Sequence, residues 1–119
     1  MAKHNEFGRF GEQKSVEYLR DSGYEILAQN YRYLNAEIDI VAKKKGILAI
    51  VEVKARNTGF LEDIANTINP KKIKLLTLAA HQFVVEHDLD LEVRFDVITV
   101  IQSDKKIEIQ HLENAFYYF

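Results

Sequence analysis

Two acidic residues and a lysine lie inside apolar, strand-forming segments near the middle of the chain. Asp39 lies in the segment 37–42, and Glu52 and Lys54 lie in the segment 47–56. Side chains two residues apart on a strand point to the same face, so Glu52, Lys54 and Arg56 are expected to share a face. Burying such charges is unfavourable by several kcal/mol unless they pair with an opposite charge or bind an ion. The segment therefore predicts either an internal salt bridge or a cation-binding site.

The second acid favours the cation-binding site. A short turn connects the two segments, so the strands should be neighbours about 4.8 Å apart, on which Asp39 and Glu52 can converge if their register brings them together. Nearby carboxylates repel each other unless a cation lies between them, and Mg²⁺ prefers one or two carboxylates with waters and a substrate phosphate. Bound Mg²⁺, or Mn²⁺, would polarise a phosphate and lower the pKa of a water molecule, which Lys54 could orient. Asp39, Glu52 and Lys54 are therefore candidate catalytic residues for phosphodiester hydrolysis.

Periodicity and turn residues predict an α/β fold around these residues. Apolar residues have helical spacing in 5–22, before Gly23, and in 70–87, which begins at the only proline. The first three strands have short connections and should be antiparallel, whereas the last two can join the sheet only after a helical crossover. The prediction is a mixed central β-sheet flanked by helices. In the order αβββαββ, the expected elements are 5–22, 25–32, 37–43, 47–56, 70–87, 92–101 and 106–112.

Length and composition favour a single domain covering residues 1–119. Hydrophobic residues make up 47% and charged residues 29% of the chain, which is typical of a globular protein. The absence of cysteine excludes disulfides and thiolate metal sites. Neither a signal-peptide pattern nor a run of about 18 apolar residues is present, so we expect a cytoplasmic protein outside the membrane. The four histidines lack zinc-ligand spacing and are expected at surface or packing positions.

The distribution of charge predicts a nucleic-acid partner. The net charge is −2, but residues 43–74 contain eight basic and three acidic residues, and a basic region attracts polyanions. Three of these lysines crowd the first turn of the helix at 70–87, where the helix dipole favours acids; a phosphate partner would account for them, and a solvated face is the alternative. Phosphate contacts position a nucleic acid without reading its sequence. The candidate contacts are Arg56, Lys71, Lys72, Lys74 and Lys43, the last of which could equally belong to a solvated turn.

The spacing of the candidate catalytic residues resembles a known nuclease motif. Asp39, followed by Glu52-Val53-Lys54, resembles the Asp…(Asp/Glu)-X-Lys signature of the PD-(D/E)XK nucleases. Further segments extend the likeness over nearly the whole chain, which is similar to the bacterial YraN family of predicted endonucleases, relatives of archaeal Holliday-junction resolvases. These segments are Gly8-Arg9-Phe10-Gly11-Glu12, Gly23-Tyr24-Glu25-Ile26-Leu27, Asn30-Tyr31-Arg32, Ala36-Glu37-Ile38-Asp39-Ile40-Val41-Ala42, Val51-Glu52-Val53-Lys54-Ala55-Arg56, Arg94-Phe95-Asp96-Val97-Ile98 and Asn114-Ala115-Phe116.

This resemblance implies a restriction-endonuclease-like core and a metal-dependent endonuclease acting on DNA, including branched or junction structures in repair or recombination. It implies that Glu12 joins Asp39 and Glu52 at the metal; Glu12 lies on an otherwise apolar helical stripe, although a solvated glutamate near a helix start is the alternative. It also implies a homodimer, because resolvases cut two symmetric strands. Gly8 and Gly11 are each unfavourable in a helix by about 1 kcal/mol, which indicates a close backbone approach or a helix that begins after them.

Two other functions remain open from the sequence. A non-catalytic module of the same fold would use the basic surface to bind nucleic acid for a partner enzyme. Such a module would show salt-sensitive binding without turnover. An interaction protein would use Glu52 and Lys54 as an internal ion pair and would bind no nucleic acid.

Overall fold

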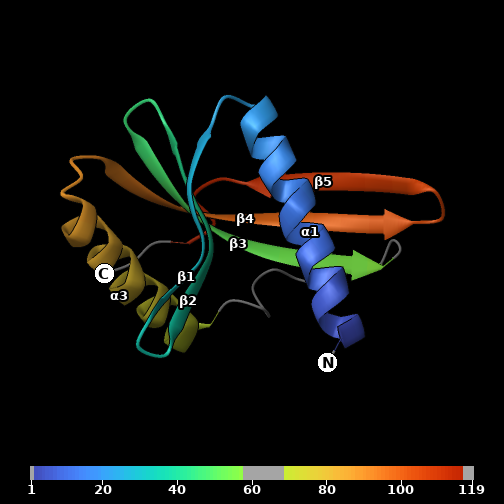
Figure 1. Ribbon diagram of the computed structural model, residues 1–119, viewed down its shortest axis with the longest axis horizontal. Helices are drawn as coiled ribbons and strands as arrows, with labels where there is room; N and C mark the ends of the chain where they lie inside the picture. The colour runs from blue at the N-terminus through green and yellow to red at the C-terminus, as the bar shows by residue number, and fades with distance from the viewer. Residues whose placement is uncertain (1, 58–68, 117–119) are drawn as a thin grey trace.

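The computed structural model describes residues 2–57 and 69–116, which form an α-helix, three strands, a second α-helix and two strands (Figure 1). These elements are α1 (Ala2–Asp21), β1 (Glu25–Tyr33), β2 (Ala36–Lys44), β3 (Ile47–Asn57), α3 (Pro70–His87), β4 (Glu92–Ser103) and β5 (Lys106–Leu112). The strands and α3 agree with the expected bounds to within two residues, and α1 begins three residues earlier than expected. Neither described helix is long and apolar enough to cross a membrane.

The described strands form one sheet in the order β1-β2-β3-β4-β5. Neighbouring strands are antiparallel except β3 and β4, which run parallel from the pair Ile47 and Glu92 to the pair Asn57 and Gln102. A parallel pair needs a crossover connection, and α3 lies in the segment that links β3 to β4. The mixed sheet predicted from the order of the elements is therefore confirmed.

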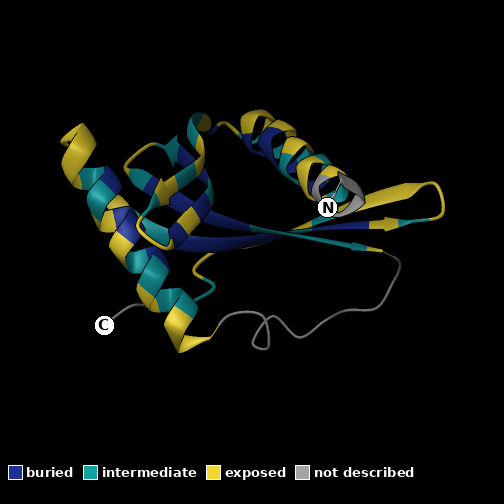
Figure 2. Ribbon diagram, turned by 60° about the horizontal axis from the view of Figure 1, so that its bottom comes forward, coloured by how far each residue is buried: buried dark blue, intermediate teal, exposed yellow. Residues whose placement is uncertain are grey.

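Helices α1 and α3 pack on opposite faces of this sheet. Residues of β3 alternate between the faces, because Leu48 and Ile50 pack with α3 whereas Ala49 and Val51 pack with α1. In Figure 2 the buried residues lie in the middle of the sheet and on the sides of the helices that face it. The α3-side cluster also includes Ile38, Leu76, Phe83 and Phe95, and the α1-side cluster also includes Val16, Leu19, Ile40 and Ile98.

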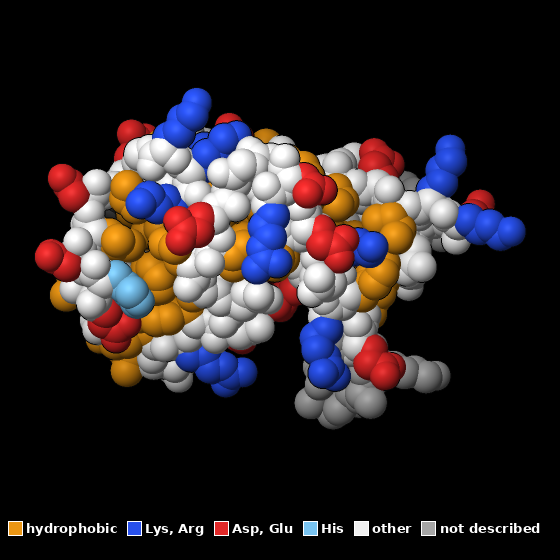
Figure 3. Space-filling model, turned by 45° about the horizontal axis from the view of Figure 1, so that its top comes forward, with side chains coloured by type: hydrophobic (Ala, Val, Ile, Leu, Met, Phe, Trp, Pro, Cys, Tyr) orange, Lys and Arg blue, Asp and Glu red, His pale blue; other side chains and the backbone are white. Residues whose placement is uncertain are grey.

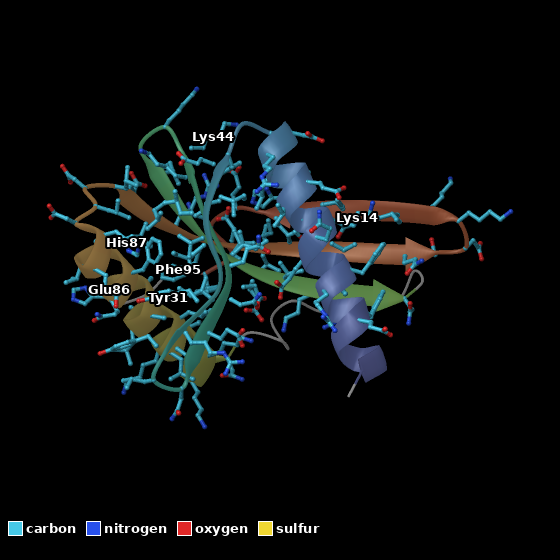
Figure 4. All side chains as sticks on the ribbon, viewed as in Figure 1. Lys14, Tyr31, Lys44, Glu86, His87 and Phe95 are labelled. Atoms are coloured by element: carbon cyan, nitrogen blue, oxygen red, sulfur yellow. The ribbon has the colours of Figure 1, made fainter. Side chains whose placement is uncertain are left out.

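Local hydrogen bonds and turns fix the ends of the helices. Gly23, two residues after the end of α1, adopts φ +94°, a conformation that glycine tolerates without steric conflict. Before α3, the side-chain oxygen of Asn69 accepts a hydrogen bond of 2.9 Å from the backbone N–H of Lys72, which is a preferred N-cap arrangement. On β1, the Tyr31 hydroxyl donates a hydrogen bond of 2.8 Å to Glu86 of α3 (Figure 4). The first turn of α3 is thereby capped, and α3 is linked to the edge strand β1 of the sheet.

Gly11 lies where α1 packs closely against β3. A Cβ atom at position 11 would lie 3.0 Å from the Cβ of Ala55, whereas a Cβ atom at Gly8 would have no described atom within 4 Å. Both glycines lie inside α1. A close backbone approach therefore explains Gly11, and the helix does not begin after the two glycines.

Candidate active site

The two predicted acids lie where the β2–β3 ladder ends. Ile40 pairs with Val51, and the next residues outward on the two strands are Asp39 and Glu52. In place of a further backbone pair, Oδ2 of Asp39 accepts a hydrogen bond of 2.8 Å from the backbone N–H of Val53. The Asp39 carboxylate therefore replaces a backbone acceptor and is fixed relative to β3.

Strand β2 changes the direction in which its side chains face at Asp39. On a regular strand, side chains two residues apart lie on the same face. Ile38, however, belongs to the α3-side cluster and Ile40 to the α1-side cluster. The local irregularity places Asp39 between the two layers of the core, where it is accessible from both sides of the strand.

Two open cavities meet at Asp39, and Glu37 also lines both of them. The α3-side cavity has a volume of about 330 Å³, and the α1-side cavity has a volume of about 510 Å³. The polar residues that line only the α3-side cavity are Asn35, Glu52, Asn69, Lys71 and Lys72. The α1-side cavity is lined by Gly8, Arg9, Glu12, Asn30 and Arg32 as well.

The surroundings of Asp39 strongly disfavour its ionised form. Burial is the main cause, and the negative charge of Glu52 adds to it; together they raise the pKa of Asp39 to about 7. The negative charge of Glu12 acts in the same direction, whereas the Val53 N–H and the charge of Lys72 oppose it only in part. The site around Glu12, Asp39 and Glu52, called the centre below, therefore contains a carboxyl group whose ionised form is disfavoured first by burial and second by the charges of two nearby acids.

Glu52 is the most deeply buried acid of the centre, and two lysines contact it. Its side chain is 6% exposed, and its oxygen Oε2 lies 3.1 Å from Nζ of Lys54 and 2.6 Å from Nζ of Lys72. The structure thus brings Glu52 and Lys54 together as the strand pattern predicted. It also places Lys72, which was predicted only as a nucleic-acid contact, directly on an acid of the centre.

Glu12 lies on the α1 side of the centre and has a partner of its own. Its oxygen Oε1 accepts a hydrogen bond of 3.1 Å from the side-chain amide of Asn30. Burial raises the pKa of Glu12, and the charges of Glu37 and Glu52 contribute in the same direction. Across residues 2–57 and 69–116, no three His, Asp or Glu side chains are arranged to hold a metal ion. The charges of Glu12, Asp39 and Glu52 therefore affect one another, but the three side chains are not arranged as a set of metal ligands.

The predicted nucleic-acid contacts are distributed unevenly around the centre. Lys71 lines the α3-side cavity with Lys72, and Lys74 is exposed on the same helix. Arg56 donates a hydrogen bond of 2.9 Å to its neighbouring carbonyl on β3. Lys43 pairs with Leu48, four residues along the strands from the acids and thus about 13 Å away. Of the five predicted contacts, Lys71 and Lys72 are therefore the two that the structure places at the cavity.

Several polar residues that line the cavities were not predicted as site residues: Glu37 in both cavities, Asn35 and Asn69 in the α3-side cavity, and Arg9, Asn30 and Arg32 in the α1-side cavity. Arg32 lies 3.7 Å from Glu37 and is largely exposed. Asn30 has φ +54°, a left-handed conformation that asparagine adopts more readily than most residues. An asparagine inside a strand segment was the available signal for an irregularity at this point.

The pairing of two lysines with Glu52 is a local feature. On the face shown in Figure 3, acidic and basic side chains are interspersed with exposed hydrophobic ones. The net charge of the chain is −2. The basic residues beside Glu52 and in the first turn of α3 therefore do not extend a general positive surface.

A second buried polar cluster, centred on Asp96 of β4, has internal partners for its charges. Asp96 is fully buried, and Arg94 donates hydrogen bonds of 2.9 and 2.8 Å to its two carboxylate oxygens. His111 Nε2 lies 2.8 Å from Asp96, and His111 Nδ1 lies 2.9 Å from the Tyr18 hydroxyl. The Tyr24 hydroxyl accepts a hydrogen bond of 2.6 Å from Arg94. This cluster ties α1 and β5 to β4, and it agrees with the expectation that His111 has a packing role.

Comparison with known proteins identifies relatives along the whole chain. The family model described as Uncharacterised protein family UPF0102 matches residues 11–100. A UPF0102 protein of Flavobacterium psychrophilum is 48% identical over 119 residues, which is 100% of both chains. A UPF0102 protein of Christiangramia forsetii is 46% identical, again over 100% of both chains. A UPF0102 protein of Bacteroides thetaiotaomicron is 41% identical over 98% of this chain and 97% of its own.

Proposed function

We propose that this chain, which belongs to the protein family UPF0102, is a metal-dependent endonuclease that hydrolyses phosphodiester bonds in DNA. UPF0102 is the YraN family expected from the sequence. One observation carries the proposal. The partly buried Asp39 lines the same cavity as Glu52, whose charge raises the pKa of Asp39, and two lysine ammonium groups lie within 3.1 Å of Glu52. Acids that repel each other beside fixed cations suit a site that binds a divalent ion and an anionic substrate.

The donor set fits Mg²⁺ or Mn²⁺. Carboxylate oxygens are hard ligands, and Mg²⁺ uses one or two of them when substrate phosphate and waters complete its coordination. Asp39 and Glu52 would be the principal ligands and Glu12 an auxiliary one. A cation between the acids would relieve the repulsion that raises the pKa of Asp39. When bound, such an ion polarises the scissile phosphate and lowers the pKa of a water molecule.

The residues of the chain supply position and charge. The Val53 N–H holds Asp39 against β3, and Lys54, on the same strand as Glu52, orients that carboxylate. The Lys54 ammonium is also available to neutralise charge that develops on the phosphate in the transition state. The cavity of about 330 Å³ is at the small end of ligand sites, so the sugar–phosphate backbone, rather than a whole duplex, would enter it.

The topology supports a nuclease core of the PD-(D/E)XK kind. The observed order αβββαββ and the mixed sheet agree with a restriction-endonuclease-like core, with the acids on its second and third strands. From the resemblance we further propose a cytoplasmic enzyme, acting as a homodimer on branched or junction DNA in repair or recombination. Phosphate contacts from Lys71 and Lys72 would position this DNA without reading its sequence.

The test is a panel of labelled linear, flapped and four-way DNA substrates incubated with Mg²⁺ or Mn²⁺. We expect wild-type protein to cleave at least one substrate, and Asp39→Asn, Glu52→Gln and Lys54→Met each to abolish cleavage while remaining folded by circular dichroism. Glu108→Gln, an equivalent change on the exposed strand β5, should cleave as wild type does. Equal cleavage by all proteins would show a contaminating nuclease, and no cleavage of any substrate would refute the proposal.

A second candidate is a non-catalytic nucleic-acid-binding module of the same fold. The ion pairs that Lys54 and Lys72 make with Glu52 favour it, since they balance the charge of Glu52 without a metal. This module would bind DNA with strong salt dependence and cleave no substrate of the panel with either metal.

A further inference from the structure

We infer that Lys72 exchanges partners when the site is filled: it pairs with Glu52 in the free chain and moves to a phosphate of the nucleic acid when a divalent cation binds the carboxylates. The exchange makes Lys72 a positioning residue that couples the binding of the cation to the binding of the nucleic acid. This inference rests on the proposed function, because it needs both ligands to bind at the same centre.

The geometry of Glu52 shows a crowded carboxylate oxygen. Oε2 lies 2.6 Å from Nζ of Lys72 and 3.1 Å from Nζ of Lys54, so two ammonium groups contact one atom. A divalent cation on Glu52 would neutralise the charge that attracts these groups and would repel both of them. At least one ammonium group therefore has to move away from this oxygen when a cation binds there.

Lys72 is the lysine that can move. Its side chain is 35% exposed, compared with 21% for Lys54 and 6% for Glu52. Its backbone does not have to follow, because the hydrogen bond to the N-cap residue Asn69 uses the backbone N–H. Lys54 lies on the same strand as Glu52, two residues away, and remains beside it. Rotation of one partly exposed side chain is therefore sufficient for the exchange.

A phosphate is the partner that suits the released ammonium group. Lys71 and Lys72 both line the α3-side cavity, together with Asp39 and Glu52, so an anion bound to these lysines lies at the acids. A cation bound to Glu52 would weaken the ion pair between Glu52 and Lys72, and a phosphate bound to Lys72 would weaken the same ion pair. Each ligand thereby removes an obstacle to the other, and by linkage the two affinities must rise by the same factor.

The experiment compares Lys72→Met with Lys71→Met in the full-length protein. Methionine keeps the length of the side chain and removes the charge, and Lys71 lines the same cavity without a direct contact to Glu52 among the described ion pairs. Calorimetry measures the affinity for Ca²⁺, a hard cation that takes oxygen ligands, in the absence of DNA. Fluorescence anisotropy measures the affinity for a labelled four-way DNA, with Ca²⁺ and with a chelator.

We expect Lys72→Met to raise the Ca²⁺ affinity about fivefold or more, the lower end of typical coupling between sites, and Lys71→Met to raise it by much less. In wild type and Lys71→Met, Ca²⁺ should strengthen DNA binding by the same factor, and this factor should be smaller in Lys72→Met. The inference is overturned if both variants change the Ca²⁺ affinity equally or if the factor is the same in all three proteins. If wild type binds neither Ca²⁺ nor DNA, the proposed function itself is wrong and the inference with it.

Discussion

Replacing Asp39 by asparagine should stabilise the fold while it removes the proposed chemistry. Asparagine has nearly the same shape, and its side-chain oxygen can still accept the hydrogen bond from the Val53 N–H. It cannot ionise, so it removes the conflict between a buried charge and the neighbouring Glu52. An acid that is unfavourable for folding and lies where two cavities meet is a candidate functional residue.

The expected size follows from the pKa of Asp39, which burial and the charge of Glu52 raise from 3.8 to about 7. The folded chain therefore holds this proton more tightly than the unfolded chain, and the free energy of unfolding falls as pH rises from about 4 to about 7 and then levels off. Each tenfold change in proton affinity is worth about 1.4 kcal/mol, so ionised Asp39 destabilises the fold by at most roughly 4 kcal/mol. We expect Asp39→Asn to be more stable than wild type by about 2 kcal/mol or more above this pH range.

Urea unfolding followed by circular dichroism measures this difference at a series of pH values between about 4 and about 8. The advantage of Asp39→Asn should grow across that range. Saturating Mg²⁺ should stabilise wild type at the upper end of the range, since a ligand that binds only the folded state shifts the equilibrium toward it, and should stabilise the variant much less. A variant that is less stable than wild type at high pH, or the same pH dependence in both proteins, would refute this account of the site.

Three further predictions concern the surroundings of the site. The Gly11→Ala variant should have a lower midpoint of thermal unfolding than wild type, because the added Cβ would lie 3.0 Å from a side chain of β3. The Gly8→Ala variant should have a higher midpoint, because alanine is favoured over glycine in a helix by up to about 1 kcal/mol. The reverse order of the two midpoints would contradict the packing of α1. Burial would raise the pKa of Asp96, but the hydrogen bonds from His111 and Arg94 outweigh burial and lower this pKa. The Asp96→Asn variant should therefore be less stable than wild type by about 3 kcal/mol in urea unfolding at neutral pH, and this difference should shrink as pH falls below 3.8. A stability difference that grew in acid would contradict the sign of the pKa shift. For DNA binding, Lys71→Ala should reduce the slope of log affinity against log salt by about 0.9, and Lys106→Ala on β5 should leave it unchanged; equal slopes in both variants would exclude Lys71 as a phosphate contact.

The fold was accessible from the sequence because its signals are local. Short turns joined β1, β2 and β3, and helical periodicity ran from Pro70 to the end of α3. The parallel pair β3–β4 followed from the helix between those strands, which prevents a simple hairpin. The sequence predicts the start of α1 three residues too late, at residue 5 rather than Ala2. Gly8 and Gly11 left a still later start open, because the contact between Gly11 and β3 that favours a glycine there is tertiary.

The centre was predictable only in part. Strand periodicity placed Glu52 and Lys54 on one face, and their contact of 3.1 Å follows from that spacing. The contact between Lys72 and Glu52 joins residues 20 apart through the packing of α3 on the sheet, which no local pattern contains. The change in side-chain direction along β2 at Asp39 could not be predicted from the sequence either, because it depends on where the pairing of β2 with β3 ends.

The parallel pairing of β3 with β4 also bears on how the centre is assembled during folding. Asp39 and Glu52 belong to a hairpin whose strands are connected by a short turn, whereas the pairs of β3 with β4, such as Ile47 with Glu92, join residues 45 apart. Contacts that are distant in sequence form more slowly because a longer loop must close first. We therefore expect the mutually repelling acids to meet early, before α3 delivers Lys72, so that high salt or a divalent cation should accelerate refolding. Pulse-labelled hydrogen exchange would contradict this order if the amides of β2 and β4 became protected at the same time.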